Sequence, residues 1–202
     1  DIDAEAAIEI ARQCEAAALG SDSRVTNSEG ASVSAHTAER VYGNTLGFIA
    51  GYPSSYASIS CVVMGQAGDQ QERDYWYSAS RDPSALEAPE AIGQRAAQRT
   101  VARLGARRIP TTRAPVLYVP ELARGLLGHF LGAIRGGSQY RRSSFLLDAA
   151  GEQIFPAFFS MSERPHLLGA LGSAPFDGEG CRTADRELVR AGVLDGYVLD
   201  TY

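Results

Sequence analysis

The stretch that most constrains the fold runs from Glu121 to Asp148, where apolar residues and glycines follow one helical pattern. Large apolar side chains recur at the three- and four-residue spacing of one helix face, at Leu126, Leu127, Phe130, Leu131 and Ile134. Glycines stand four apart on the same helix and so share a face, at Gly128, Gly132 and Gly136. We therefore expect a helix with a side-chain-free groove that another element can approach closely. Gly136-Gly137 should end this helix, and an apolar strand should follow at Phe145–Leu147.

The first half of the sequence predicts a helix, an antiparallel sheet and a second helix. Asp3 is a candidate N-cap for a helix that reaches Leu19, and a capping-box pattern at Ser84 begins a helix that reaches Leu104. Between residues 32 and 80 the apolar period changes to two, most clearly at Ala57, Ile59, Cys61 and Val63. With turn residues that include Tyr52-Pro53-Ser54, this pattern predicts a meander of about four strands.

A domain boundary is predicted at Gly105–Pro115, which contains two prolines and no apolar periodicity. Residues 1–110 then form one α+β domain, and residues 111–202 form the start of a second. In the second domain the apolar runs 116–119 and 153–159 are typical of strands, and Asp195-Gly196 predicts a hairpin turn. Residues 165–183 are rich in glycine and are expected to form mostly loop. The fold class predicted for the chain is therefore α+β.

Charge and composition exclude several classes of protein. The net charge is −5 and the chain contains no lysine, so neither half has the basic excess of a nucleic-acid binder. No apolar run approaches the roughly 20 residues that a membrane helix needs, and no signal-peptide pattern opens the sequence. Cys14, Cys61 and Cys181 are widely spaced without a Cys-x-x-Cys motif, which predicts free thiols in a reducing cytoplasm.

Several long blocks of the sequence resemble one known family. They are RVTNSEGASVSAHTAERVYGNTLGFIAGY, GLLGHFLGAIRGGSQYRRSSFLLD, PHLLGALGSAPFDGEGCRT and GVLDGYVLDTY, in the order of the PmbA (TldE) branch of the TldD/PmbA family. The resemblance implies that the chain is an internal piece of a longer protein, in which residues 111–202 begin the C-terminal domain. It also implies a cytoplasmic subunit of a TldD/TldE metalloprotease complex that acts on unfolded or flexible peptides, in peptide-antibiotic maturation and antitoxin degradation.

The resemblance further implies that this chain has no catalytic residue and no metal ligand. TldD-type subunits carry His-Glu-x-x-x-His on the glycine-striped helix, where two imidazoles bind a metal and the glutamate activates water. Those positions fall here on Leu127, Gly128 and Gly132, and the neighbouring His129 is interpreted as a packing or hydrogen-bonding residue. Zinc is then expected in a TldD-type partner, and this chain would form a heterodimer with that partner or a homodimer when alone.

Two further groups of residues leave alternatives open. The acid-free window from Leu122 to Leu147 holds Arg141 and Arg142, which would bind an anion or peptide terminus, or order the loop through salt bridges. The family shares the loop Phe-Asp-x-Glu-Gly-x-Arg-Thr. In it, Asp177 and Glu179 would bind a cation or act as acid and base, with Cys181 as a nucleophile. Alternatively, Asp177 and Arg182 would set the loop conformation at a subunit or domain contact. The candidate substrate or interface residues are therefore Gly128, His129, Gly132, Gly136, Arg141, Arg142, Asp177 and Arg182.

The family's older name, modulator of DNA gyrase, implies a second hypothesis, a non-enzymatic interaction protein for which two surface patterns would be the contact surface. Arg95, Arg99 and Arg103 form a stripe at helical spacing, interpreted as a solvated face or a subunit contact. Tyr75-Trp76-Tyr77 is an aromatic platform or peptide-binding edge, or has one face packed on a helix. A third hypothesis is an independent hydrolase with Cys181 as its nucleophile.

Overall fold

The computed structural model describes residues 2–201 and divides the chain into two compact units. The first unit runs to Pro110 and also takes in Leu168–Leu171, and the second begins at Thr111. Each unit combines helices with a three-stranded antiparallel sheet, so the expected α+β class is confirmed. Among residues 2–201 no helix combines the length and the apolar character needed to cross a membrane.

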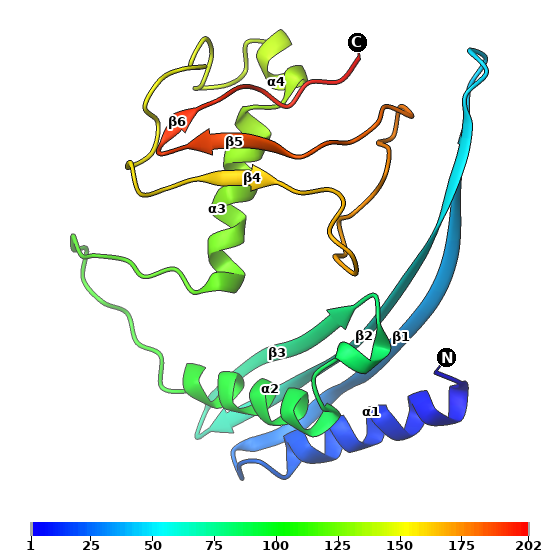
Figure 1. Ribbon diagram of the computed structural model, residues 1–202. Coiled ribbons are helices and arrows are strands. Elements are labelled where there is room, and N and C mark those ends of the chain that lie inside the picture. The colour runs from blue at the N-terminus through cyan, green and yellow to red at the C-terminus, as the bar shows by residue number, and fades with distance from the viewer. Residues whose placement is uncertain (1, 202) are drawn as a thin grey trace. The chain divides into compact units, whose positions relative to one another are not determined.

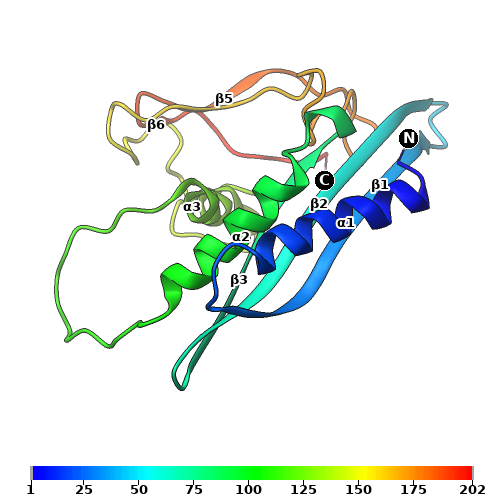
Figure 2. The ribbon, with the colours of Figure 1, turned by 90° about the horizontal axis from the view of Figure 1, so that it is seen from below.

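In the first unit, two helices cover one face of the sheet (Figures 1 and 2). Helix α1 spans Ala4–Leu19, and its predicted cap is confirmed because the Asp3 carboxylate accepts a hydrogen bond of 2.8 Å from the amide of Ala6. Helix α2 spans Pro89–Arg103 and starts later than the sequence predicted. The reason is that Asp82, and not Ser84, provides the cap: it accepts from the amide of Ser84 and starts the short 3-10 helix η1, Pro83–Ala85.

The sheet of the first unit has three long strands, so the prediction of about four was wrong. They are β1, Val25–Gly43; β2, Ile49–Ala67; and β3, Gln70–Ser80, in the order β1-β2-β3. The predicted turn at Tyr52-Pro53-Ser54 lies inside β2, where Pro53 pairs with Glu39. Proline is tolerated there because β3 stops where Ser80 faces Ala57, so β2 is an edge strand beyond that point. The period-two residues Ala57, Ile59, Cys61 and Val63 are all buried, as predicted.

The two helices of the first unit meet at Gly93. A Cβ built on Gly93 would lie 2.0 Å from the carbonyl oxygen of Cys14. Since only a glycine leaves room for that oxygen, Gly93 sets the distance between α1 and α2. The sequence predicted a close approach of this kind at Gly128–Gly136, in the second unit. It did not predict the one at Gly93.

In the second unit, the three-stranded sheet packs with a helix (Figure 1). Helix α3 spans Pro120–Ala133, and the strands β4, β5 and β6 follow one another in the antiparallel sheet. Their bounds are Met161–Glu163, Arg186–Arg190 and Val193–Leu194. The core of the unit is formed by Phe130, Ala133, Ile134, Leu146, Leu188, Val189 and Leu194.

Helix α3 ends close to the predicted place, but a short helix follows it at once. This helix, α4, spans Gly136–Tyr140, so the two glycines that were expected to end α3 also begin the next helix. The carbonyls at the end of α3 are satisfied from α4: the hydroxyl of Ser138 donates to Gly132 O at 2.9 Å, and the side-chain Nε2 of Gln139 donates to Ala133 O at 2.6 Å.

Three predicted strands of the second unit do not form: 116–119, 145–147 and 153–159 lie outside the strands. Tertiary hydrogen bonds replace the ladder in two of them. The Tyr197 hydroxyl donates to Leu146 O, and the amides of Ile154 and Phe155 both donate to Gly192 O. The hairpin turn lies at Ala191-Gly192, which have φ of 46° and 83°, and not at Asp195-Gly196.

Candidate functional site

Two glycines of the predicted stripe, Gly128 and Gly132, have no close neighbour among residues 2–201. Phe130 and Ala133 are buried in the core, whereas Gly128 and His129 are exposed and Gly132 is half-buried. A Cβ built on Gly128 or on Gly132 would meet no atom of the described residues within 4 Å. The two glycines therefore leave the backbone of α3 open to approach, while the groove and the element that would fill it stay predictions.

Gly136 has a different role from the other two glycines. Its amide donates to Val198 O at 2.7 Å, and the amide of Val198 donates to Ile134 O at 2.9 Å. A Cβ at Gly136 would also lie 3.3 Å from Leu199 Cδ2. Gly136 therefore fastens the C-terminal segment to the junction of α3 and α4.

Arg141 and Arg142 lie at the end of α4. Arg141 lines a depression of ≈ 600 Å³ that it shares with Gly132, Arg135, Ser138 and Asp200 among others. The window that lacks acids in sequence thus has an acidic residue, Asp200, beside it in space. Arg142 has a left-handed φ of 52° and closes the turn after α4.

The three positions to which the resemblance assigns the TldD-type metal motif carry no metal-ligating side chain. Leu127 carries an apolar side chain, and Gly128 and Gly132 carry none, so no ligand atom and no general base stands at these three places. The three imidazoles have separate surroundings: His129 lies on α3, His36 contacts the ring of Tyr56, and His166 bonds to Thr183.

Among residues 2–201, one cluster of three potential ligand atoms is present, at Asp177, Glu179 and Cys181, within 4.8 Å of one another. Its carboxylates already accept backbone hydrogen bonds. Asp177 Oδ1 accepts from the amides of Glu179 and Cys181 at 2.9 Å, and Glu179 Oε2 accepts from the amide of Thr201 at 2.9 Å. Backbone pairing between Phe176 and Arg182 closes the same loop. These contacts favour the interpretation that Asp177 sets the loop conformation.

The arginine stripe of α2 lies beside β3 and is still largely exposed, since Arg95 and Arg103 are exposed and Arg99 is half-buried, so the interpretation as a solvated face holds in part. The guanidinium carbons of Arg95 and Arg99 lie 4.0 Å and 5.2 Å from the ring centroid of Trp76. Arg99 and Arg103 also pair with the buried Asp74 carboxylate at 3.5 Å and 3.6 Å. Trp76 thus packs on the helix, as one of the two interpretations held, and Tyr75 lies on the other face of the sheet, stacked on Tyr77.

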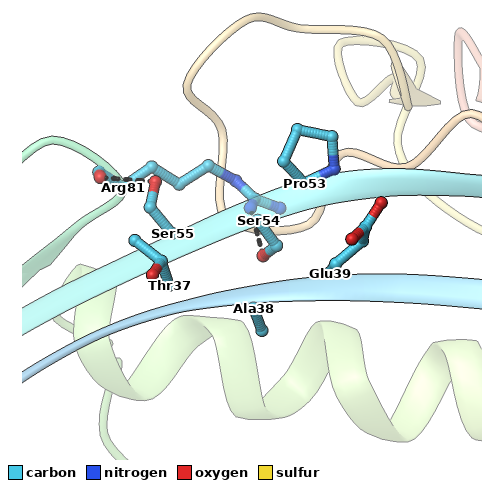
Figure 3. Close-up of a pocket in the computed structure, with 7 residues that line it drawn as sticks. All are labelled: Thr37, Ala38, Glu39, Pro53, Ser54, Ser55 and Arg81. Atoms are coloured by element: carbon cyan, nitrogen blue, oxygen red, sulfur yellow. Dashed lines mark hydrogen bonds between the residues drawn. The ribbon is translucent and has the colours of Figure 1, made fainter.

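A depression that sequence reasoning missed lies beside Arg81 (Figure 3). It has a volume of ≈ 500 Å³ and is lined by Thr37, Ala38, Glu39, Pro53, Ser54, Ser55 and Arg81. Arg81 donates to the Ser54 hydroxyl at 2.8 Å, and the Ser55 hydroxyl donates to the Arg81 carbonyl at 2.8 Å. The same guanidinium donates to the carbonyls of Ala170 and Leu171. These hydrogen bonds hold both serines to Arg81, and His36 lines an adjoining depression together with Ser54 and Ser55.

The sequence and the fold of this chain are similar to those of known proteins. The model of the PmbA/TldA metallopeptidase central domain matches residues 1–104, and that of the C-terminal domain of the same family matches residues 111–202. The chain belongs to the PmbA/TldA metallopeptidase family. This confirms the resemblance drawn from the sequence blocks.

Two metalloproteases are similar to this chain in sequence. The metalloprotease PmbA homolog of Haemophilus influenzae is 48% identical over 202 residues, and metalloprotease PmbA of Escherichia coli O157:H7 is 44% identical. Each match covers 100% of this chain and 45% of the relative. The chain therefore spans about half the length of the curated relatives it matches.

Solved structures of the family have the same fold. A candidate modulator of DNA gyrase from Bacteroides thetaiotaomicron superposes with a TM-score of 0.91 at 28% identity, over 99% of this chain and 46% of that one. TldE from Thermococcus kodakarensis superposes with a TM-score of 0.73 at 20% identity, over 95% of this chain and 44% of that one. At this lower identity the likeness concerns the fold alone.

Proposed function

We propose that this chain is part of a PmbA/TldE-type subunit that pairs with a TldD-type subunit in a peptide-hydrolysing metalloprotease, and that it supplies no catalytic group. The observation that carries the proposal is the side-chain chemistry of α3. By the family resemblance, the two imidazoles and the glutamate of the TldD-type motif would fall on Leu127, Gly128 and Gly132, which carry no ligand atom. In this assignment the zinc ion and the water-activating carboxylate belong to the partner.

The contribution of this chain would be a surface for the partner or for the peptide. Gly128 lies on one exposed side of α3, where a partner could approach the backbone closely. The apolar side chains of Leu122 and Leu126, which are 64% and 49% exposed, lie on a different side of the helix and offer a separate apolar contact. Unfolded or flexible peptides are the proposed substrates, since precursor trimming and antitoxin degradation both act on such chains.

The test uses the full-length protein and the TldD-type subunit of the same organism. Zinc content is measured for each subunit, and cleavage of an unstructured peptide is followed with each alone and with both together. We expect zinc only in the TldD-type subunit and full cleavage only in the mixture. Stoichiometric zinc in this protein, with cleavage in the absence of the partner, would overturn the proposal.

A variant of this protein provides the matched control. Leu127→His, Gly128→Glu and Gly132→His together restore the three motif residues on the same helix. If the backbone of α3 suits the motif, the triple variant takes up zinc that the parent protein does not, which also shows that the zinc assay detects a bound ion. Equal zinc uptake by the parent and the variant would place the metal elsewhere in this protein and contradict the assignment.

A second hypothesis is a non-enzymatic protein that modulates DNA gyrase, a role that appears in the name of the Bacteroides relative. Of the surfaces first suggested for it, Trp76 is buried against Arg95 and Arg99, whereas Arg95 and Tyr75 stay exposed. Saturable binding of the purified full-length protein to gyrase, lost on substitution of exposed residues such as Tyr75, would support this hypothesis over the first.

A further inference from the structure

No strand among residues 2–201 pairs with the outer edge of β1, since β1 pairs with β2 alone in the order β1-β2-β3. Two bulges interrupt the ladder between β1 and β2 up to Gly30, whereas the stretch from Ala31 to Gly43 is regular. Bulges and prolines are devices that protect a strand edge from further pairing. The regular stretch contains neither, so its edge is open to another strand.

The far part of this stretch belongs to a ribbon of only two strands. Because β3 ends where Ser80 faces Ala57, β1 and β2 run on without it (Figure 1). Apolar side chains at the far end of the ribbon are exposed, with Val41 at 65%, Leu46 at 92% and Ile49 at 79%. A two-stranded ribbon is only marginally stable in water by itself. We therefore expect another protein element to support this one.

The free hydrogen-bonding groups of β1 lie at the odd-numbered residues of Ala31–Gly43. Opposite residues in an antiparallel pair either exchange both hydrogen bonds or turn both sets of groups away from each other. Pro53 has no amide hydrogen and lies opposite Glu39, which suits a pair of the second kind. At the turn, the amide of Asn44 donates to Phe48 O at 3.0 Å, so the even-numbered residues point toward β2. Both observations turn the backbone groups of Glu39, and of every second residue from it, toward the free edge.

This free edge is complementary to itself. If a two-fold axis perpendicular to the sheet passes beside Thr37, two copies of β1 run antiparallel and odd-numbered residues fall opposite odd-numbered residues. The outward donors of each copy then meet the outward acceptors of the other. Thr37 is the centre of the regular stretch, so Ala31 of one copy lies opposite Gly43 of the other and the whole stretch is paired.

The side chains also suit this register. The exposed Val41 falls opposite Val33 of the other copy, and Val33 packs against the core of the first unit. Glu39 and Arg40 both fall opposite uncharged residues, so no like charges meet. A register centred on Glu39 or on Arg40 would instead place that charge opposite itself.

We propose that β1 is a dimerisation edge, at which Ala31–Gly43 pairs with the same stretch of a second copy of this chain. The two three-stranded sheets then join into one continuous sheet, and each ribbon gains a third strand. An extended peptide of arbitrary sequence would supply the backbone contacts but no matched residues opposite Val33 and Val41, so a second copy fits the edge better. The inference does not depend on the proposed protease function.

The experiment measures the mass of the full-length protein by sedimentation over a range of concentrations. We expect a dimer that dissociates on dilution. Thr37→Pro removes an amide that points to the free edge and leaves the ladder with β2 intact. The variant should therefore be monomeric at concentrations at which the parent protein is a dimer, with an unchanged circular dichroism spectrum. A parent protein that stays monomeric, or a folded proline variant that still dimerises, would overturn the proposal.

Two cysteine variants test the register and do not depend on the folding of the proline variant. In both, the exposed Cys181 is first replaced by alanine. Thr37→Cys places two identical thiols side by side at the axis, so mild oxidation should give a covalent dimer that dithiothreitol reverses. Glu39→Cys is the matched control on the same strand, because Glu39 faces Ala35 of the other copy and the two new thiols lie far apart. Equal crosslinking of both variants, or none of Thr37→Cys, would contradict the pairing.

An unstructured peptide tests the other occupant of the edge. Its binding is followed with the parent protein and with Thr37→Pro. Under the proposal, the peptide should not dissociate the dimer of the parent protein. A monomeric parent protein that binds the peptide, with loss of binding in Thr37→Pro, would assign the edge to peptides and overturn the proposal.

Discussion

The guanidinium carbon of Arg95 on α2 lies 4.0 Å from the centre of the Trp76 ring on β3. This contact joins two patterns that the sequence shows separately, the arginine stripe and the aromatic strand. The next arginine of the stripe, Arg99, contacts the same ring and also forms a salt bridge with Asp74. A stripe of cations on a helix therefore serves here as a packing surface, in which an aromatic ring and a buried carboxylate offset the charge.

Removal of the Trp76 ring should destabilise the first unit strongly. Trp76→Ala is expected to lower the free energy of unfolding by about 3–5 kcal/mol, because it leaves a cavity in the core. It also removes the aromatic ring that the guanidinium groups of Arg95 and Arg99 contact. Tyr75→Ala is the matched control on the same strand, since Tyr75 is 51% exposed. Chemical denaturation of both variants checks the difference, and an equal effect of the two would contradict the packing described here.

The hydroxyl group of Tyr197 should contribute to the stability of the second unit. The Tyr197 hydroxyl donates to Leu146 O at 2.9 Å and accepts from the amide of Ala149 at 2.7 Å. Tyr197→Phe keeps the ring and leaves both backbone groups without this partner, at an expected cost of about 1–3 kcal/mol. Hydrogen exchange at the Ala149 amide should accelerate at the same time. Unchanged protection of that amide would mean that the hydrogen bond contributes little.

The sequence predicted the elements that local rules control. The helix from Asp3 to Leu19 has a side-chain cap and a glycine end, and the buried face of β2 alternates strictly at Ala57, Ile59, Cys61 and Val63. Both signals depend on neighbours within a few residues, so they can be recognised without the fold.

The errors concern contacts between residues that are distant in sequence. Pro53 is typical of a turn, yet it lies in a strand because β3 ends opposite Ala57 and leaves β2 with an open edge. The run 145–147 has strand-like residues, but the hydroxyl of Tyr197 binds its backbone in a turn. For the same reason the acid-free window could not reveal Asp200, which approaches Arg141 from the far end of the chain.

Stability at acidic pH should depend on Asp22. Hydrogen bonds from the Arg24 side chain, and then from its backbone amide, lower the pKa of Asp22 from 3.8 to about 2. Because the folded protein holds the ionised carboxylate more firmly than the unfolded chain does, this contribution is present above the unfolded pKa and is lost as the pH falls through the folded pKa. Asp22→Asn should therefore be less stable than the parent protein above about pH 4, and the difference should shrink toward about pH 2.

Urea unfolding of the two proteins across this range checks the expectation. Asp22 is largely screened by solvent, so the difference in midpoint should be small. A difference that stayed constant with pH would mean that Asp22 acts through its shape and not through its charge.

The glycines of α2 and α3 should respond in opposite ways to the same substitution. At Gly93 a methyl group would lie 2.0 Å from the Cys14 carbonyl oxygen. The helices must then move apart, at an expected cost of about 3 kcal/mol or more. At Gly128 no described atom lies within 4 Å, so Gly128→Ala should stabilise the isolated protein by about 1 kcal/mol through its higher helix propensity.

Measurement of the complex then separates stability from assembly. The proposal that a partner element enters the α3 groove predicts that Gly128→Ala, although more stable alone, binds the TldD-type subunit more weakly, because the methyl group occupies the space of that element. Thermal unfolding of the isolated variant and titration with the partner give the two quantities independently. A variant that is more stable and binds the partner as tightly as the parent protein would show that the groove faces solvent in the complex, and would remove α3 from the proposed interface.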